Sequence, residues 1–408
     1  MRTSTFTLFT AAIACALSQQ ISPALSSERV IHSFGSTQTD GGFPLATLLN
    51  VNGKFYGTTG QGGANSQGGT VFSLDPKTGK EKVLYSFCSA PLCRDGTQPR
   101  AGLIEMSGLL YGTTSGGGAN GGGVVFSVDP VFGLEKVVYS FCSQQNCTDG
   151  EQPFGGLFAA KGMFYGTTVA GGANGEGTVF ALDPNTGQAQ VLHAFGAGMD
   201  GASPRATLIG VRSKLYGTTD LGGANNGGTV FSLNPATGAE TVLYSFCSRE
   251  NCTDGSNPIG GLIRIGPELY GTTDNGGANN KGTVYALAPR DGVEKVLYSF
   301  CSRKKCADGD GPYVGLIKHR GLLFGTTEYG GTDGCHDYGC GTVFAVNPVT
   351  GAETPIYSFC SAHGCTDGAS PAGGLIHDKG KLYGTTTAGG ISTICKGGCG
   401  TVFEIQNP

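Results

Sequence analysis

Five stretches of the sequence place two cysteines five positions apart, directly before an Asp-Gly pair, as in SFCSQQNCTDGEQP at residues 140–153. Paired thiols of this kind can hold a metal, exchange disulfides or form a structural bond. Zinc sites more often have a gap of two to four residues between the cysteines, with two such pairs that face each other. Redox sites usually have only two residues between the cysteines. Neighbouring pairs that recur along the chain are typical of structural disulfides on short loops if the protein is exported.

The first residues support this interpretation because they resemble an export signal. Arg2 precedes an apolar stretch at residues 6–17, and small residues follow, with cleavage expected after Ser18 or Ser26. Residues 1–26 are thus predicted to be a signal peptide, and the chain from 27 to 408 to be secreted, periplasmic or on the cell surface. No later apolar stretch is long enough for a membrane helix.

Without Cys15, which lies in the signal, the cysteines form seven neighbouring pairs. An oxidising compartment favours disulfides between them. Adjacent pairing is the simplest arrangement, although loops of neighbouring units could also exchange partners. The expected pairs are Cys88 with Cys93, Cys142 with Cys147, Cys247 with Cys252, Cys301 with Cys306, Cys335 with Cys340, Cys360 with Cys365, and Cys395 with Cys399.

The aspartates of the Asp-Gly pairs are the first candidate ligand-binding residues. If the loops turn towards a common axis, their carboxylates form a ring that could attract a cation or a polar ligand. Alternatively, each aspartate bonds its own backbone and the glycine takes a positive φ. The structural role is favoured because every unit has the residue and one ligand rarely needs seven equal contacts. The aspartates are Asp40, Asp95, Asp149, Asp200, Asp254, Asp308 and Asp367.

Histidines in the last two units are further candidates for a ligand-binding site. His336 and His363 lie in loops that differ from those of the other units, and with Asp337 they could bind a metal if their side chains converge. Solvated loop histidines are the alternative. His32 and His193 take the place of a repeated tyrosine and are expected to be packing residues.

An internal repeat must position all of these residues. YGTT or FGTT begins at 56, 111, 165, 216, 270, 324 and 383, and GTVF or a variant follows each time. One unit shows four strands, at 101–106, 109–114, 123–130 and 135–141, with a proline and a glycine reversing the chain before the fourth. No long stretch has a helical period. A period near 50 residues with four short strands predicts an all-β propeller of four-stranded antiparallel blades.

The chain ends indicate seven blades in a closed ring. Residues 28–34 resemble a fourth strand with nothing before it, whereas the last unit stops after a third strand. The N-terminal strand should therefore complete the last blade and leave no open edge. The predicted units span 40–87, 95–141, 149–195, 200–246, 254–300, 308–359, and 367–405 together with 28–34.

The repeat LYGTT–GGAN–GTVFSLDP–TG–VLYSF resembles the tandem GloVer repeat of secreted bacterial proteins, the choice-of-anchor GloVer family, from about residue 30 to 408. The strand plan is also similar to kelch and quinoprotein propellers. This wider resemblance implies the fold and not a function.

The longest and most variable loops should emerge at one end of the propeller, which is where binding is expected. The net charge is −4 with scattered Lys and Arg, so no nucleic-acid partner is expected, and the absence of tryptophan disfavours a quinone cofactor. No catalytic motif stands out, and no cofactor is expected unless a cation binds at the channel mouth. We expect a monomeric, non-enzymatic propeller that binds a glycan or a protein. A polysaccharide lyase or hydrolase with its site at the channel mouth is the alternative, and a structural role in an envelope layer is a third.

Overall fold

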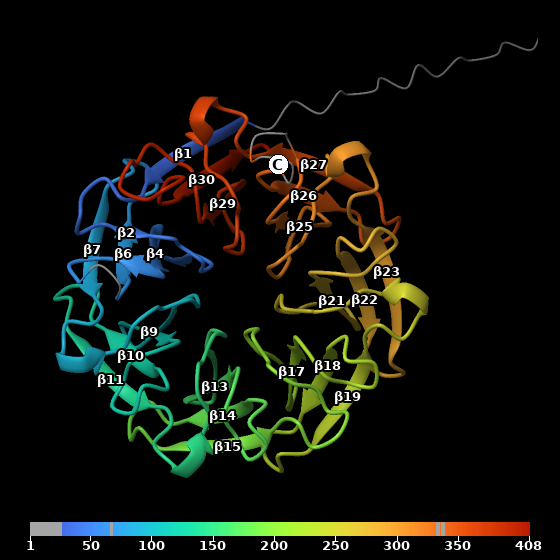
Figure 1. The fold of residues 1–408 in the computed structure, drawn as a ribbon, viewed down its shortest axis with the longest axis horizontal. Helices are drawn as coiled ribbons and strands as arrows, with labels where there is room; N and C mark the ends of the chain where they lie inside the picture. Colours follow the sequence, from blue (N-terminus) through green and yellow to red (C-terminus); the bar gives the residue numbers. More distant parts are fainter. Residues whose placement is uncertain (1–26, 66–67, 332–334, 336–338) are drawn as a thin grey trace, which may run out of the picture.

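The computed structural model describes residues 27–65, 68–331, 335 and 339–408. These residues form seven four-stranded antiparallel sheets arranged as the blades of a ring (Figure 1). The predicted all-β, seven-bladed propeller is therefore confirmed. The proposed signal peptide at 1–26 and the candidate ligand His336 lie outside the described residues.

Each blade runs from an innermost strand of three residues to an outermost fourth strand. The first four complete blades are β3 (Leu49–Val51), β4 (Lys54–Thr59), β6 (Thr70–Leu74) and β7 (Glu81–Ser86); β8 (Ile104–Met106), β9 (Leu109–Thr114), β10 (Val124–Val128) and β11 (Glu135–Ser140); β12 (Phe158–Ala160), β13 (Met163–Thr168), β14 (Thr178–Leu182) and β15 (Ala189–Ala194); and β16 (Ile209–Val211), β17 (Lys214–Thr219), β18 (Thr229–Leu233) and β19 (Glu240–Ser245). The next two are β20 (Ile263–Ile265), β21 (Glu268–Thr273), β22 (Thr283–Ala288) and β23 (Val293–Ser299), and β24 (Ile317–His319), β25 (Leu322–Thr327), β26 (Thr342–Val346) and β27 (Glu353–Ser358).

The seventh blade closes the ring. It contains β28 (Ile376–Asp378), β29 (Lys381–Thr386), β30 (Thr401–Gln406) and, as its outermost strand, β1 (Ser27–Ser33). The pairing of β1 with β30 is antiparallel and runs from Ser27 opposite Gln406 to Ser33 opposite Thr401. Figure 1 shows the blue first strand beside the red last ones. Closure by the N-terminal strand, as expected from the chain ends, gives the seventh blade its fourth strand, so that all seven blades have four strands. Each blade keeps two short edges, contrary to the expectation that no edge would stay open.

The last three residues of the YGTT motif each have a separate structural role. Its glycine leaves room for the aromatic ring of the next strand, because a Cβ on Gly166 would lie about 2.5 Å from Cζ of Phe180. The second threonine, such as Thr168, bonds the threonine that opens GTVF in the neighbouring strand, here Thr178, at 2.8 Å between their hydroxyls. The first threonine reaches the next blade: Thr167 Oγ1 donates to the Ala206 carbonyl at 3.2 Å.

Aromatic rings join the blades to one another. The phenylalanine that ends each fourth strand packs edge-on against the aromatic residue of GTVF or its variant in the following blade, as Phe141 does on Phe180 with centroids 5.1 Å apart. Both side chains are almost completely buried. This contact repeats at all seven junctions, so each blade shares its core with both neighbours.

Two small features of the fold were not expected from the sequence. A two-stranded pair, β2 (Gly41–Gly42) with β5 (Gln61–Gly62), lies in the first unit. Five cysteine loops each contain a single 3₁₀ turn: η1 (Pro91–Cys93), η2 (Gln145–Cys147), η3 (Glu250–Cys252), η4 (Lys304–Cys306) and η6 (His363–Cys365). The described residues include no helix with the length and apolar character to span a membrane.

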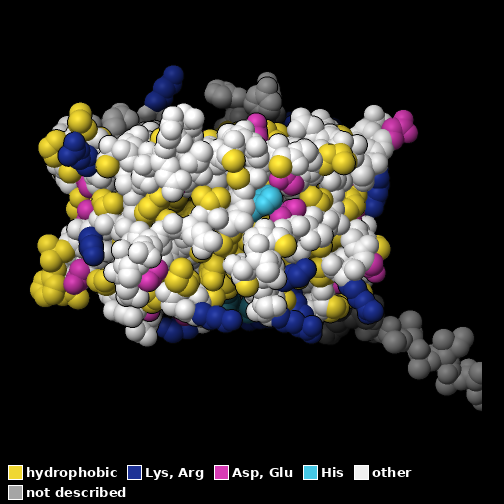
Figure 2. All heavy atoms as spheres, turned by 90° about the horizontal axis from the view of Figure 1, so that it is seen from below, with side chains coloured by type: hydrophobic (Ala, Val, Ile, Leu, Met, Phe, Trp, Pro, Cys, Tyr) yellow, Lys and Arg dark blue, Asp and Glu magenta, His cyan; other side chains and the backbone are white. Residues whose placement is uncertain are grey.

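The side of the ring is mixed in character. Figure 2 shows hydrophobic side chains spread among polar ones, with Lys and Arg gathered along one edge. Basic residues occupy several of the short turns between the first and second strands, such as Lys161 and Arg212. The two ends of the propeller therefore differ, because the opposite end carries the longer cysteine loops.

Candidate functional site

The cysteine loops and the glycine-rich loops after YGTT lie together at one end of the ring. In the second unit, Thr97 and Gly116 form a backbone bridge, and the Gly118 amide donates to the Cys93 carbonyl at 2.9 Å. The equivalent contacts recur in other units. The predicted common face is thus present, and it carries the connections that vary most between units.

All seven disulfides join neighbouring cysteines. In five loops both cysteines and the residue before the second one have left-handed backbone, as shown by Cys142 (φ 60°), Asn146 (57°) and Cys147 (52°). This backbone conformation costs a non-glycine residue roughly 1–2 kcal/mol of conformational free energy. In the two loops without a disulfide, Gly35 and Gly196 take the place of the first cysteine with positive φ, which costs a glycine little. We conclude that the bond holds a strained loop in shape.

The Asp-Gly aspartates bind the loops in which they lie. Asp254 accepts hydrogen bonds from the Tyr244 hydroxyl (2.8 Å), the Ser248 amide and hydroxyl (2.9 Å each) and the Arg249 amide (3.2 Å). Asp95, Asp149, Asp308 and Asp367 receive the same hydroxyl bond from a tyrosine of the outermost strand. The seven carboxylates are therefore placed under separate loops, and their role as ligand groups stays a prediction.

Burial and hydrogen bonding act in opposite directions on these carboxyls. Burial alone would raise the pKa of Asp254, but hydrogen bonds from Ser248 and Tyr244 outweigh it and lower the pKa. A glutamate at each of several junctions shows the opposite shift. At the junction of the first and second blades, burial and the negative charge of Asp95 raise the pKa of Glu135 to about 7. Each such pair lies where the outer strands of two blades meet.

The histidine candidates are not brought together by the described residues. His363 is exposed in η6, and His336 and Asp337 are outside the described ranges. The crowding of disulfides in the last units is present, because the sulfur atoms of Cys335, Cys340, Cys360 and Cys365 lie within 4.8 Å of one another. His193 packs edge-on against Phe195 as the repeated tyrosines do against their phenylalanines.

A cavity lies on the ring axis and is built by one short segment from each blade. A space of about 330 Å³ is lined by the residues between the repeated proline and the innermost strand of every unit. A second hollow of about 350 Å³, bounded also by residues of the loop face such as Gln98 and Thr387, shares four wall residues with it. The residue directly after the proline differs in each unit except for two arginines: Leu45, Arg100, Phe154, Arg205, Ile259, Tyr313 and Ala372.

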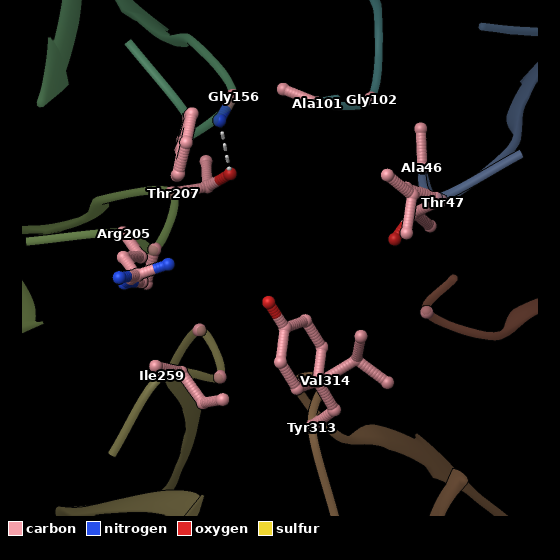
Figure 3. A pocket seen from close by; sticks show the side chains of 18 of the residues that line it. Ala46, Thr47, Ala101, Gly102, Gly156, Arg205, Thr207, Ile259, Tyr313 and Val314 are labelled. Atoms are coloured by element: carbon pink, nitrogen blue, oxygen red, sulfur yellow. Dashed lines mark hydrogen bonds between the residues drawn. The ribbon is translucent and has the colours of Figure 1, made fainter. Parts of the chain in front are cut away.

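One wall of the cavity is aromatic and cationic. The guanidinium carbons of Arg100 and Arg205 lie 5.0 and 5.5 Å from the centroid of the Phe154 ring. Arg205 also pairs with Asp220 at 2.9 Å, whereas Arg100 forms no ion pair with any residue in the described part of the chain. Figure 3 shows the Tyr313 hydroxyl pointing to the centre of the cavity, with Arg205 across from it.

Carboxyl groups gather beside this wall, in the residues that follow YGTT in units four to six. They are Asp220, Asp274 and Glu328, and Asp310 lies close to them. Asp310 is neutralised by Lys281 at 2.7 Å. Burial, together with the nearby carboxylates, raises the pKa of Asp274 to about 6. Among the residues that the structure describes, the mouth of the channel thus offers one cation without an ion pair, two aromatic rings and a carboxyl group that can exchange a proton near neutral pH.

Sequence reasoning missed the residues of this cavity, although the sequence holds a signal for them. Residues that were singled out, such as the Asp-Gly aspartates, recur in every unit. The cavity residues occupy two repeat positions, after the proline and after YGTT, where the residue type changes from unit to unit between nearly constant neighbours. An alignment of the seven units that looks for variable positions between constant ones would identify these residues.

Comparisons with known proteins agree with the fold. A family model described as Gloeobacter/Verrucomicrobia repeat matches residues 19–147 and 132–335. No match was found among curated protein sequences. The oligogalacturonate lyase of Vibrio parahaemolyticus is 10% identical with a TM-score of 0.52, over 94% of this chain and 97% of that one. An oligogalacturonate lyase in complex with manganese is 11% identical with a TM-score of 0.51, over 94% and 96%.

A third similar structure is the extracellular domain assigned to a hybrid two component system of B. thetaiotaomicron. It is 8% identical with a TM-score of 0.58, and the match covers 92% of this chain and 39% of that one. At such low identities, these likenesses concern the architecture alone.

Proposed function

The chain belongs to the Gloeobacter/Verrucomicrobia repeat family, and from its channel mouth we propose that it is an exported binding propeller that holds an acidic glycan on the disulfide-bearing face. The seven disulfides fit an oxidising compartment outside the cytoplasm. The observation that carries the ligand class is Arg100, a guanidinium at the mouth that stacks on Phe154 and forms no ion pair within the described residues.

The surroundings of Arg100 suit a sugar acid. An arginine can take a carboxylate or sulfate through two parallel hydrogen bonds. Aromatic rings such as Phe154 and Tyr313 offer flat apolar surface with low conformational entropy cost. Carboxylates such as Asp274 and Glu328 can accept hydrogen bonds from sugar hydroxyls. A cavity of about 330 Å³ is within the range of small-ligand sites.

Binding to an array of acidic and neutral oligosaccharides, followed by calorimetric titration of the best ligand, tests the proposal. Arg100→Ala and Phe154→Ala should each weaken binding of the acidic ligand at least tenfold, which corresponds to about 1.4 kcal/mol. Lys161→Ala, in a short turn at the other end of the ring, is the matched control and should bind normally. Silence across the array, or binding that survives Arg100→Ala, would contradict the proposal.

A lyase or hydrolase acting on an acidic polysaccharide is the second candidate, and the raised pKa of Asp274 favours it. A carboxyl group with a pKa raised to about 6, next to the arginines of the cavity wall, can serve as a general base or acid near neutral pH. The fold is also shared with lyases named for oligogalacturonate. Product release from uronate polymers that disappears in Asp274→Asn, with ligand binding retained, would establish this activity. Intact binding without any turnover would leave the propeller a binding protein.

A further inference from the structure

The seven junctions between blades share one arrangement, with two exceptions. At five junctions a tyrosine of the outer strand, the Asp-Gly aspartate and a cysteine pair occur together. The two junctions without a cysteine pair are also the two in which histidine replaces the tyrosine: His32 before Asp40, and His193 before Asp200. The loss of a covalent bond therefore coincides with the gain of a metal-binding side chain.

At the first of these junctions three potential ligands converge. One atom each of His32, Asp40 and Glu81 lies within 4.8 Å of the others, and His32 Nε2 is 3.6 Å from Asp40 Oδ2. His32 Nε2 and Glu81 Oε1 are buried atoms without a hydrogen-bond partner among the described residues. The Asp40 side chain is almost fully buried, and Ser36 and Gly41 already fix its orientation through hydrogen bonds.

The second histidine junction differs from the first in two respects and serves as an internal comparison. His193 Nε2 lies 3.0 Å from Asp200 Oδ2, so the two groups satisfy each other directly. The glutamate of that junction, Glu240, does not join them in a cluster as close as the first one. His193 is thus hydrogen-bonded to its aspartate, whereas His32 lies slightly too far from Asp40 for a hydrogen bond.

We propose that His32, Asp40 and Glu81 form a binding site for a divalent transition metal of the zinc type. Imidazole and carboxylate oxygens are both accepted zinc ligands, with bonds of about 2.0–2.1 Å. Ligand atoms of a tetrahedral zinc site are then about 3.3 Å apart, close to the separation of His32 and Asp40. Water completes the fourth position. Calcium and magnesium prefer sites made only of oxygen, so the histidine selects against them.

The location of the site gives the metal a structural role. His32 belongs to β1, the strand that completes the seventh blade, whereas Glu81 begins β7, the outer strand of the first blade. Asp40 lies on the connection between these blades. A bound metal therefore joins the outer strands of the first and seventh blades, at a junction whose own loop has no cysteine pair. The ring itself closes within the seventh blade, where β1 pairs with β30. This inference does not depend on the proposed glycan site.

Zinc titration of the untagged, fully oxidised chain tests the proposal. After treatment with a chelator, wild-type protein should bind one equivalent of Zn²⁺ in calorimetry, retain it on desalting, and unfold at a higher temperature than the metal-free protein. His32→Tyr should lose all three effects, and it introduces the residue that five other junctions carry. His193→Tyr is the matched control and should bind zinc normally. Ca²⁺ and Mg²⁺ should have no effect.

Glu81→Gln provides a second variant in case His32→Tyr folds poorly, and it should also abolish zinc binding. A thiol assay must show no free cysteine, so that reduced thiols are not the ligands. Zinc that is not retained by wild-type protein, or that binds equally to His32→Tyr or Glu81→Gln, would overturn the proposal and leave a water molecule as the partner of these atoms.

Discussion

The blade junctions and the channel mouth are built from the same repeat, but they differ in how the repeat is used. At five of the seven junctions the unit supplies the same tyrosine, serine and aspartate with the same hydrogen bonds. At the mouth the residue after the proline is aliphatic, aromatic or basic depending on the unit. Repetition thus marks the residues that hold the ring, and variation marks the residues that face a ligand.

This division has a physical basis in the backbone. The first threonine of YGTT donates to a carbonyl in the axial segment of the next blade, as Thr113 does to Gly155 at 3.2 Å. The axial segment is therefore fixed through its main chain. Its side chains can differ from unit to unit, because this bond uses only the main chain of the segment. The predictions below test how strongly the junction residues act on stability.

The largest effect is expected from Asp254→Asn. The carboxylate accepts four hydrogen bonds from buried or partly buried donors, and the amide would turn an NH₂ group towards some of them. Unfolding in denaturant should show a loss of about 3 kcal/mol. Asp129→Asn is the control and should change stability by less than about 0.5 kcal/mol, since asparagine occupies the equivalent turn position at 234 and 347. Equal losses of stability in both variants would show that the junction aspartate is no more important for folding than an aspartate of an exposed turn.

A smaller effect is expected from removing one disulfide with Cys142→Ser and Cys147→Ser. Closing so short a loop restricts the unfolded chain by about 2 kcal/mol or less. The strained loop should open locally, so hydrogen exchange should increase at residues 142–150 and stay unchanged in the other units. A loss of protection throughout the ring would show that the bond supports more than its own loop.

The smallest effect concerns pH and Glu135. Burial beside Asp95 raises its pKa to about 7 from the usual 4.5, so the folded chain holds a proton that the unfolded chain releases. The stability that this proton confers is complete below about pH 4.5 and is lost as the pH rises through 7. Glu135→Gln stays neutral and should be more stable than wild type at pH 8 by under about 1 kcal/mol, since solvent screens the pair. Denaturation at pH 5 should show no difference, and a gain at pH 5 would contradict the assignment.

The sequence was sufficient for the architecture because local and repeated patterns determine it. The YGTT and GTVF motifs, the turn residues and the unmatched strands at the chain ends predict four-stranded blades, their number and the closure of the ring. The adjacent cysteine pairing is also local. For the Asp-Gly aspartates the sequence predicts only hydrogen bonds to their own backbone. The bond from the Tyr244 hydroxyl to Asp254 was not expected, because the tyrosine lies in the preceding strand.

The sequence was not sufficient for the cavity, since that depends on distances between units. Arg100 and Arg205 lie more than one hundred positions apart, yet both stack on Phe154 because three blades converge at the axis. The closeness of His32 to Glu81 likewise follows from the packing of two blades, since the two residues lie on the outer strands of adjacent blades. The repeat positions of these residues can be recognised in each unit of the sequence. Which of the residues meet is decided by the three-dimensional arrangement of the blades.

The single side chain that each blade extends after its proline has an evolutionary consequence. Seven independent positions surround one hole, and each can change by a point mutation while the supporting backbone keeps its bonds. A lineage could therefore explore many chemistries for the hole without passing through unstable intermediates, much as antibody loops diversify on a constant framework. Duplicating or exchanging whole units would shuffle these positions in blocks.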